Sequence, residues 1–496
     1  MKEYDETNPK SIEAYGKEMI GKTFQDIWEN NKNNREYGVN NRALHERTAS
    51  YQYANNHTRK EYKGGLGNLV EECYFQYHSN SDSDPDFPEA GVELKVTPYK
   101  QIKNGIAAKE RLILTMINYF SLIKEPSFEE SHLWHKSKLM LLVWYLYQKG
   151  IPKRNFHVDY VSLFTPPPED LKIIKQDYEK IVDKVRKGKA HELSEGDTLY
   201  LGAATKSSDS STRRKQPCSP ELAKSRAFSF KNSYMTHILR SYIANGSTTA
   251  ESIVRHGETV SDFEKYVIDK IRTHKGKSVP ELCREFSVNI EKKPKNLESI
   301  LAFRILGVKG NHAEEFEKAG VVVKAIRIEA NGKIKESMSF PVIDYQKLAN
   351  ETWDNSCFGN YLRDTRFFFV IYKRGADGKL YLSGSQFWNI PQKDLEGDVR
   401  EVWQETHDII ASGRLTICID EKGGIRNNLP KMKDHLIAHV RPHARNRQDM
   451  KPLPKGTDIQ LDKASKQKWK YGARFIKQCF WLRNTYILSQ ITPENR

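Results

Sequence analysis

The pattern of apolar and polar positions predicts a chain that mixes helices and strands. Apolar residues recur at helical spacing over residues 11–30 and 68–77, and a charged periodic stretch over 169–186 predicts a further helix. Short runs with the composition of strands lie at 91–96, 112–120, 139–147 and 227–230. Periodicity alone leaves helix open for the two longest of these runs. The pattern predicts an α/β fold with a mixed central sheet flanked by helices.

The sequence contains an internal repeat. Four segments of the first half resemble four of the second half in the same order: 21–24 with 276–279, 90–95 with 319–324, 170–171 with 394–395, and 227–235 with 479–487. Such colinear matches predict two homologous domains of about 250 residues each. The polar stretch 244–261 lacks an apolar period and is the predicted boundary, which gives domains 1–245 and 262–496. Residues 79–85 and 207–220 are predicted loops.

The composition and net charge of the chain indicate which class of molecule it binds. The chain has 496 residues, 38% of them hydrophobic, with 80 Lys and Arg against 64 Asp and Glu and a net charge of +16. Such a basic chain fits a polyanion, either nucleic acid or an anionic membrane. No membrane-spanning run, secretory signal or lipidation motif is readable, so we expect nucleic acid and no membrane. The six cysteines are scattered without a C-x-x-C pair, which fits a reducing cytoplasm.

The stretch 86–95, DFPEAGVELK, carries a candidate catalytic motif. On a strand, residues i and i+2 share a face, so Glu93 and Lys95 project side by side, and a turn over 88–91 can return Asp86 to the same place. Two carboxylates bind a hard cation such as Mg²⁺, and an ammonium group can orient water or neutralise charge. The pattern therefore suits metal-dependent phosphodiester hydrolysis. A surface hairpin with a salt bridge is the alternative interpretation.

The surrounding residues resemble a known family. The run PDFPEAGVELKVTP is similar to the active-site segment of the mismatch-repair endonuclease MutH. The longer stretch PDFPEAGVELKVTPYKQIKNG, with HELSEG and KNSYMT downstream, resembles still more closely the GATC-cutting type II restriction endonucleases of the MutH fold, the Sau type. The resemblance covers essentially the whole chain. It implies two MutH-like restriction-endonuclease-fold domains, of which only the first is catalytic, with Mg²⁺ as the cofactor.

The resemblance assigns the catalytic residues one at a time. Asp86, Glu93 and Lys95 fall on the Asp, Glu and Lys of the family motif, with Asp86 and Glu93 as the metal ligands. Glu71 falls on the Glu of the preceding helix, and we prefer it to its neighbour Glu72, which would point about 100° away. Lys136 falls on a Lys that approaches the scissile phosphate. An ordinary exposed basic residue is the alternative interpretation of Lys136.

The DNA-reading residues follow in the same way. The family loop falls near residues 200–206, where MutH has Arg-Pro-Lys and this chain has Ala-Thr-Lys, so only Lys206 matches. Lys206, Arg213 and Arg214 could reach guanine O6 and N7 in the major groove, or contact phosphates without reading sequence. The MutH Tyr of the following strand is Ser229 here, which leaves methylation sensing open.

The second domain is expected to bind DNA without cutting it. The repeat aligns Glu93 with Val322, Lys95 with Lys324, Asp86 with Glu315 and Lys136 with Asp364, and no acid lies between 299 and 312. A valine cannot bind Mg²⁺, and an Asp repels a phosphate. The stretch 440–443, Val-Arg-Pro-His, resembles the MutH reading loop, so Arg441 and His443, together with Arg445 and Arg447, are candidate DNA-binding residues. A purely structural second domain is the alternative.

Two other patterns are set aside. His435, His439 and His443 have the spacing of zinc ligands on a helix, but Pro442 and the alternation of apolar and polar residues predict a strand and loop instead. His132 and His135 are interpreted as structural or surface residues.

These observations predict a Mg²⁺-dependent type II restriction endonuclease that recognises GATC and hydrolyses both strands. The second domain would be an allosteric effector, with one GATC site per domain and a protein that is a monomer or a DNA-induced dimer. The alternatives are a MutH-like nicking enzyme, a catalytically silent DNA-binding regulator, and a binding module for acidic surfaces.

Overall fold

The chain forms two compact units. The computed structural model describes residues 3–36, 65–77, 84–103, 105–207, 212–244, 246, 250–255, 258, 260–289, 294 and 296–496. By their contacts, Met1–Val182 and Arg226–Thr249 make the first unit, and Asp183–Ser225 and Ala250–Arg496 make the second. The segment 183–225 thus groups with the second unit. The boundary at 244–261 stays a proposal, and we call residues 1–245 and 262–496 the first and second repeat.

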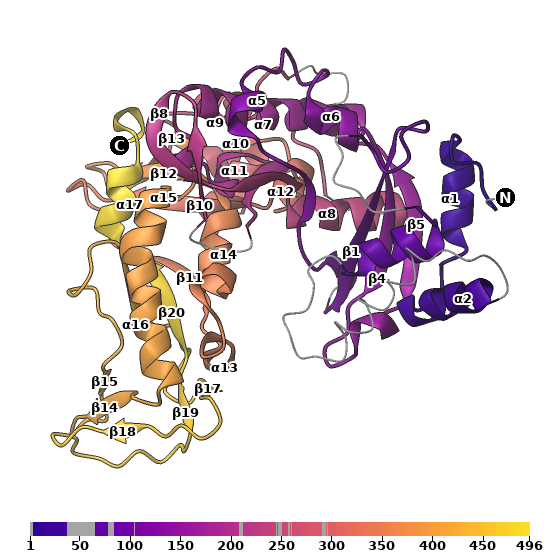
Figure 1. Cartoon of the computed structure of the whole chain (residues 1–496). Coiled ribbons are helices and arrows are strands. Elements are labelled where there is room, and N and C mark those ends of the chain that lie inside the picture. Colours follow the sequence, from indigo (N-terminus) through magenta and orange to yellow (C-terminus); the bar gives the residue numbers. More distant parts are fainter. Residues whose placement is uncertain are drawn as a thin grey trace. The chain divides into compact units, whose positions relative to one another are not determined.

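The first unit contains a helical N-terminus followed by alternating strands and helices (Figure 1). Its elements are α1 (Pro9–Lys17), α2 (Phe24–Glu36), α4 (Gly65–Leu69), the π-helix η1 (Val70–Tyr74), β1 (Val92–Ile102), β2 (Gly105–Ala108), β3 (Leu112–Met116), α5 (Tyr119–Leu122), α6 (His132–Ser137), β4 (Leu139–Leu146), η2 (Lys153–Asn155), β5 (Val158–Phe164), α7 (Pro168–Arg186, whose last turn groups with the second unit), β9 (Arg226–Phe230), α8 (Asn232–His237) and η5 (Ile238–Ile243).

The second unit begins with the segment taken from the first half of the chain and continues through the C-terminal half. Its elements are η3 (Ala190–Glu192), η4 (Glu195–Asp197), β6 (Leu201–Thr205), β7 (Arg213–Gln216), β8 (Ser219–Lys224), α9 (Phe263–Arg272), α10 (Val279–Glu285), α11 (Leu297–Ile305), α12 (Glu314–Ala319), β10 (Val321–Ile328), β11 (Met338–Val342), α13 (Tyr345–Leu348), η6 (Trp353–Asn355), α14 (Cys357–Asp364), β12 (Arg366–Arg374), β13 (Leu380–Trp388), α15 (Gln392–Asp394), η7 (Leu395–Val399), α16 (Arg400–Ala411), β14 (Thr416–Ile419), β15 (Ile425–Asn427), β16 (Ala438–Pro442), β17 (Met450–Pro452), β18 (Gln460–Leu461), β19 (Arg474–Ile476), β20 (Gln478–Leu482), α17 (Asn484–Gln490) and η8 (Pro493–Asn495).

A mixed sheet in the order β2-β1-β4-β5 forms the centre of the first unit. Strands β1 and β4 run parallel, whereas β2 and β5 are antiparallel to their neighbours. Residues 140–144 of β4 have no exposed surface, which fits an interior parallel strand. Helix α1 packs on this sheet through Gly16, where a Cβ atom would lie 3.1 Å from Val161 Cγ1 and 3.3 Å from Leu141 Cδ2. A separate sheet has the strand order β3-β9-β6, in which β3 and β9 are antiparallel.

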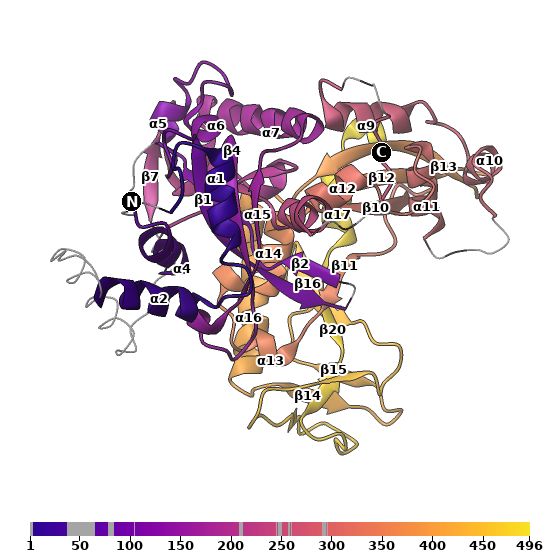
Figure 2. The same ribbon diagram turned by 90° about the vertical axis from the view of Figure 1, so that its right-hand side faces the viewer.

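The same arrangement recurs in the second unit. In the sheet β10-β12-β13, β10 and β12 run parallel and β13 is antiparallel to β12, as in β1-β4-β5. The antiparallel pair β11 and β20 corresponds to the pair β3 and β9. Strand β20 also pairs with β16 in the antiparallel sense. Helix α16 lies alongside β16 (Figure 2). The predicted α/β class and internal repeat are therefore confirmed by the strand order.

Several predicted elements are confirmed and others differ for local reasons. The helix over 169–186 and the strands over 91–96, 139–147 and 227–230 are present. The predicted helix over 11–30 is two helices, α1 and α2. Between them Gly21 has φ +83°, which ends the helical path, and its N–H donates to Val158 O at 2.8 Å. The run 112–120 is a strand only to Met116. Asn118 then caps α5 by accepting from Phe120 N at 3.1 Å.

The predicted loop over 207–220 is wrong in part. Residues 213–224 form the antiparallel hairpin β7–β8, with Arg213 opposite Lys224. The buried Gln216 side chain fixes the hairpin base by accepting from Ala190 N at 2.7 Å and donating to Glu221 O at 2.7 Å. The loop over 79–85 falls largely outside the described residues. Over the described ranges, no helix combines the length and apolar character needed to cross a membrane.

The histidine series of the second unit lies on a strand and its flanks. As predicted, 438–442 is a strand, so helical zinc-ligand spacing does not apply. His439 is 2% exposed, and neither of its ring nitrogens has a hydrogen-bond partner among the described residues. Burial, together with the charges of Arg441 and Arg483, lowers its pKa to about 4. The folded state therefore holds His439 neutral.

We expect His439 to make the protein acid-sensitive. Folding lowers the pKa of His439 from about 6.5 to about 4. The free energy of unfolding is therefore unaffected by His439 above pH 6.5 and decreases as the pH falls toward 4, by at most about 3 kcal/mol. His439→Phe removes the titration and breaks no hydrogen bond, so it should leave stability at pH 7 within about 1 kcal/mol. Denaturant titrations at pH 7 and pH 4 measure the difference. The matched control is His312→Phe, at an imidazole that is 74% exposed. Equal acid sensitivity in the wild type and His439→Phe would contradict the assignment.

Candidate active site

A tight turn brings Asp86 beside the start of β1. Phe87 and Val92 exchange two backbone hydrogen bonds, Phe87 N to Val92 O at 2.9 Å and Val92 N to Phe87 O at 3.2 Å. Gly91, the last residue of the turn, has φ +63°, which a glycine adopts without strain. The Asp86 carboxylate accepts from Leu94 N at 2.8 Å. The turn thus delivers this carboxylate to the strand position between Glu93 and Lys95.

Glu93 and Lys95 form the centre of the site. Lys95 Nζ lies 2.6 Å from Glu93 Oε1, as expected for residues i and i+2 of one strand. The Glu93 side chain is 3% exposed and that of Lys95 is 20% exposed. Lys136 Nζ lies 3.8 Å from the same Glu93 oxygen. Four of the predicted residues, Asp86, Glu93, Lys95 and Lys136, are therefore brought together.

Lys136 is delivered by a short capped helix that leads into β4. Ser131 begins α6 by accepting from Trp134 N at 3.1 Å and donates its own hydroxyl to Phe128 O at 2.6 Å. Lys136 lies in the last turn of α6, three residues before β4 begins at Leu139. Because β4 is the parallel partner of β1, its start lies beside the start of β1. The sheet register thus explains how Lys136 and Glu93, which are 43 positions apart in the sequence, meet.

Glu71 approaches from a π-helix. The predicted helix over 68–77 begins as α4 and becomes the π-helix Val70–Tyr74, which is a correction to a regular α-helix and a form common at functional sites. Burial raises the pKa of Glu71 to about 7, and the negative charge of Asp86 raises it further, with Lys95 acting in the opposite sense and Glu93 adding to the rise. Glu71 therefore lies close enough to Asp86, Glu93 and Lys95 to feel their charges.

The carboxylates fit a divalent cation. Glu93 Oε2 is buried and has no hydrogen-bond partner among the described residues, although burial of a charged oxygen demands one. Burial also raises the pKa of Glu93 despite Lys95 nearby. Within the described ranges no three His, Cys, Asp or Glu side chains are grouped as a complete metal cage. Two carboxylates with remaining water ligands are the donor set that Mg²⁺ accepts.

Sequence reasoning missed one residue beside the carboxylates. The Tyr77 hydroxyl is buried and has no hydrogen-bond partner among the described residues, and its ring lies 5.2 Å from that of Phe87. Burial and then the charge of Asp86 raise its pKa. Its only sequence signal is its place as the last residue of the predicted helix over 68–77. His132 contacts Thr115 at 2.9 Å and His135 contacts Asp84 at 3.0 Å.

The corresponding positions of the second repeat carry different chemistry. Glu315, aligned with Asp86, accepts from Ser252 Oγ at 2.6 Å, Ile253 N at 2.9 Å and Val254 N at 3.0 Å, so it fastens a loop. Val322 lies opposite Phe367 in the parallel ladder, as Glu93 lies opposite Met140. The second repeat therefore keeps the strand pairing of the first, while Glu315 stabilises a loop through hydrogen bonds.

Two further charged residues of the second repeat also differ in their surroundings from the aligned residues of the first. Glu298, near the position aligned with Glu71, is paired with Arg327 at 2.8 Å. Lys324, aligned with Lys95, has its pKa lowered by burial. Neither side chain has the carboxylate-rich surroundings of its counterpart in the first repeat.

The candidate DNA-reading residues are exposed. Lys206 follows β6, and its N–H donates to Ser225 O at 2.9 Å, which ties the end of β6 to the end of the β7–β8 hairpin. Arg213 and Arg214 lie on β7 and are also exposed. The structure therefore places Lys206 directly after β6 and both arginines on β7, the next strand along the chain.

In the second repeat, Arg441 and His443 share one aromatic support. The Arg441 guanidinium lies 4.7 Å from the centre of the Trp481 ring, and the His443 ring lies 5.6 Å from the same ring. Both side chains are exposed. Sequence reasoning overlooked the neighbouring stretch 463–474, which has the sequence KASKQKWKYGAR and alternates lysines with aromatic residues. Such a composition is typical of nucleic-acid surfaces.

Comparison with known proteins matches both repeats to one family. The family model described as "DNA mismatch repair enzyme MutH" matches residues 75–177 and 307–397. The chain is 37% identical over 461 residues to the type II restriction enzyme Sau3AI of Staphylococcus aureus, which covers 87% of this chain and 93% of that protein. It is 26% identical over 183 residues to the DNA mismatch repair protein MutH of Shewanella baltica strain OS185, which covers 36% of this chain and 80% of that protein.

We expect Glu71 to lower stability at neutral and alkaline pH when metal is removed. Because folding raises its pKa from 4.5 to about 7, the buried carboxylate costs nothing below pH 4.5, and the cost is complete above pH 7. Glu71→Gln should therefore raise the free energy of unfolding by about 1–3 kcal/mol at pH 8 and leave it unchanged at pH 4.5.

Denaturant titration in EDTA measures this gain, and a divalent cation should reduce it by compensating the charge of Glu71. Glu72→Gln is the matched control, because it removes the same charge one position along the helix. An equal gain from both variants would contradict the placement of Glu71 among the carboxylates.

Proposed function

The chain belongs to the family of the type II restriction enzyme Sau3AI and the mismatch repair enzyme MutH, and we propose that it cuts both strands of duplex DNA at GATC with Mg²⁺ as cofactor. Family membership makes it a site-specific deoxyribonuclease. The observation that carries the proposal is the cluster of Asp86, Glu93 and Lys95, in which one buried oxygen of Glu93 has no hydrogen-bond partner among the described residues. This cluster is present in the first repeat and replaced in the second.

The residues of the first repeat divide the work of hydrolysis. Asp86 and Glu93 would hold Mg²⁺, which supplies polarisation of the scissile phosphodiester and a lower pKa of a bound water. Lys95, fixed by Glu93, orients the attacking water and offsets negative charge that develops on the phosphate. Lys136 approaches from the start of β4 and contacts the phosphate. Glu71 completes the acidic face from the π-helix.

The second repeat binds DNA and acts as an effector. Val322 offers no ligand, and Glu315 is engaged in hydrogen bonds to residues 252–254. Arg441 and His443 nevertheless remain exposed on Trp481. A repeat that binds a second GATC site without cutting it would influence cleavage only by favouring one state of the first repeat.

The length of the relatives supports a restriction enzyme over a nicking repair enzyme. The MutH protein of Shewanella baltica matches 36% of this chain, whereas Sau3AI matches 87% of it. A two-repeat chain thus corresponds in extent to the restriction enzyme. The proposed partner is duplex DNA with two GATC sites, one for each repeat, and the proposed compartment is the cytoplasm.

We expect Glu93→Ala to abolish cleavage of a GATC plasmid in Mg²⁺, because the variant loses a metal ligand and the anchor of Lys95. Binding of a GATC duplex in Ca²⁺ should persist. Lys324→Ala is the matched control, since it alters the aligned strand of the second repeat and should leave the hydrolytic step unchanged. Gel analysis of plasmid digests and fluorescence anisotropy of a labelled duplex measure the two properties. Wild-type cleavage by Glu93→Ala would refute the site, and nicked circles as the final wild-type product would favour the repair-type activity.

We expect a plasmid with two GATC sites to be cut faster per site than a plasmid with one site. Tethering raises the effective concentration of the second site, and the coupling should be about 5- to 150-fold. A short non-cleavable GATC duplex added in trans should partly restore the rate on the one-site plasmid. Arg441→Ala should remove the advantage and keep slow cleavage. Equal cleavage rates per site on the one-site and two-site plasmids at limiting enzyme would contradict the effector role and indicate a purely structural second repeat.

A further inference from the structure

The segment that carries the first repeat's candidate reading residues is attached to the second repeat. Residues 183–225 precede the predicted boundary, yet their contacts place them in the second unit. They include Lys206, Arg213 and Arg214. Two sets of polar contacts to the second repeat lie on either side of these three cations in the sequence, and β6 between them is also a strand of the sheet β3-β9-β6.

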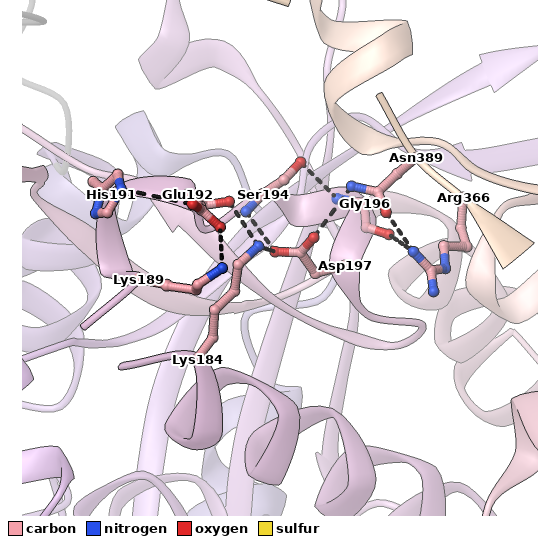
Figure 3. Close-up of polar contacts among 9 residues, drawn as sticks. All are labelled: Lys184, Lys189, His191, Glu192, Ser194, Gly196, Asp197, Arg366 and Asn389. Carbon is pink, nitrogen blue, oxygen red and sulfur yellow. Dashed lines mark hydrogen bonds and ion pairs between the residues drawn. The ribbon is translucent and has the colours of Figure 1, made fainter. Parts of the chain in front are cut away.

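The first attachment holds the short helix η4 before β6 (Figure 3). Asn389 Nδ2 donates to Asp197 Oδ1 at 3.1 Å, and Arg366 Nη1 donates to Gly196 O at 3.3 Å. Arg366 also donates to Asn389 Oδ1, so the two side chains act as one unit. Asp197 uses its other oxygen to accept from Lys184 Nζ at 2.8 Å and from Ser194 N at 2.7 Å. The segment is thus bound through both its backbone and a carboxylate.

The support beneath this attachment is a fixed part of the second repeat. Phe367 of β12 lies opposite Trp388 of β13. Arg366, directly before Phe367, and Asn389, directly after Trp388, therefore lie at the same end of this antiparallel pair of strands. Arg366 is held by two parallel hydrogen bonds to Glu264, at 2.9 and 3.0 Å, and these side chains are 13% and 14% exposed. A two-pronged ion pair of this kind fixes both position and orientation.

The contact is also close in a steric sense. A Cβ atom on Gly196 would lie 2.7 Å from Asn389 Cβ and 3.2 Å from Thr365 O. No side chain fits there without displacing η4 from the second repeat. Glycine is therefore required by the approach of the two segments.

The second attachment lies at the end of the β7–β8 hairpin. Lys224 Nζ lies 3.0 Å from Glu396 Oε1, and both side chains are mostly buried. Glu396 is itself held by Trp353 Nε1 at 3.0 Å and by Gln392 Nε2 at 3.0 Å. Lys206 and the arginines of β7 therefore lie between two anchored points, Asp197 and Lys224.

The place of the first attachment has a counterpart in the first repeat. The repeat aligns Asp364 with Lys136, and Arg366 follows Asp364 by two residues at the start of β12. In the first repeat this corner of the sheet brings Lys136 to the candidate catalytic carboxylates. In the second repeat the same corner holds a protein segment instead.

We propose that Arg366 and Asn389 are positioning residues that hold residues 194–207 and 212–224 in their DNA-reading conformation, so that the second repeat sets the sequence discrimination of the first. The inference rests on the proposed endonuclease function. It assigns the coupling between the repeats to a direct polar contact. Holding the backbone that carries the reading cations in place before DNA arrives lowers the entropy cost of binding the correct site.

Asn389→Asp tests the proposal in the full chain. It replaces an amide donor by a carboxylate facing Asp197, while the size of the side chain is kept. Amides of 198–206 and 212–224 should exchange with deuterium about 10- to 100-fold faster, as expected when a hydrogen bond to a charged group is lost. The ratio of kcat/KM for GATC to that for a site with one changed base should fall by about tenfold or more. Asn331→Asp, at an exposed turn, is the charge-matched control.

Gly196→Ala tests the same contact by sterics, with Gly310→Ala at an open exposed position as its control. It should lower the discrimination ratio in the same direction as Asn389→Asp. If either variant fails to fold, Lys224→Met removes the second attachment and should accelerate exchange over 212–224.

Unchanged exchange over both stretches in folded Asn389→Asp would overturn the attachment. Faster exchange with a discrimination ratio within about twofold of the wild type would overturn the positioning role, because a merely structural contact moves stability without moving the ratio. Failure of the proposed function is a separate result. In that case the wild type would not cut GATC at all, while the exchange measurement would still report whether the segment is held.

Discussion

The burial of the Glu93 carboxylate between two lysines is the constraint on which the candidate active site depends. A buried charge costs several kcal/mol unless partners compensate it. Lys95 at 2.6 Å and Lys136 at 3.8 Å compensate one oxygen of Glu93, and the other oxygen has no partner within the described residues. The turn that returns Asp86, the capped helix that delivers Lys136 and the π-helix that carries Glu71 all converge on this one carboxylate. The site is thus costly for the fold unless a cation is bound.

The second repeat has the same strand arrangement without a buried charged carboxylate at the position of Glu93. Its parallel ladder places Val322 where the first repeat places Glu93, and the six residues from Phe367 to Tyr372 beside it are fully buried. Glu315 and Glu298 are used to fasten neighbouring elements rather than to crowd a site. The corner of its sheet holds η4 through Arg366 and Asn389. The same structural position thus brings Lys136 to carboxylates in the first repeat and contacts a protein segment in the second.

The sequence predicted the features that depend on short-range geometry. Strand periodicity placed Glu93 beside Lys95, and the repeat predicted two homologous domains, each with a mixed central sheet. It could not predict the π-helix at Val70–Tyr74, because the difference from an α-helix lies in the hydrogen-bond pattern rather than in composition. Nor could it predict that Asp197 meets Asn389, since these residues are 192 positions apart and no periodic pattern relates them. The β7–β8 hairpin was hidden by its polar composition, because its order comes from Gln216 contacts.

We propose that one repeat carries a metal-dependent catalytic site and that the other carries none. This difference can be measured in crystals of the full chain with a non-cleavable GATC duplex and Mn²⁺, with data collected at the manganese absorption edge. We expect anomalous density beside Asp86 and Glu93 of the first repeat and none beside Val322 of the second. Anomalous density at Val322, or a first repeat that binds the duplex and stays without metal, would contradict it.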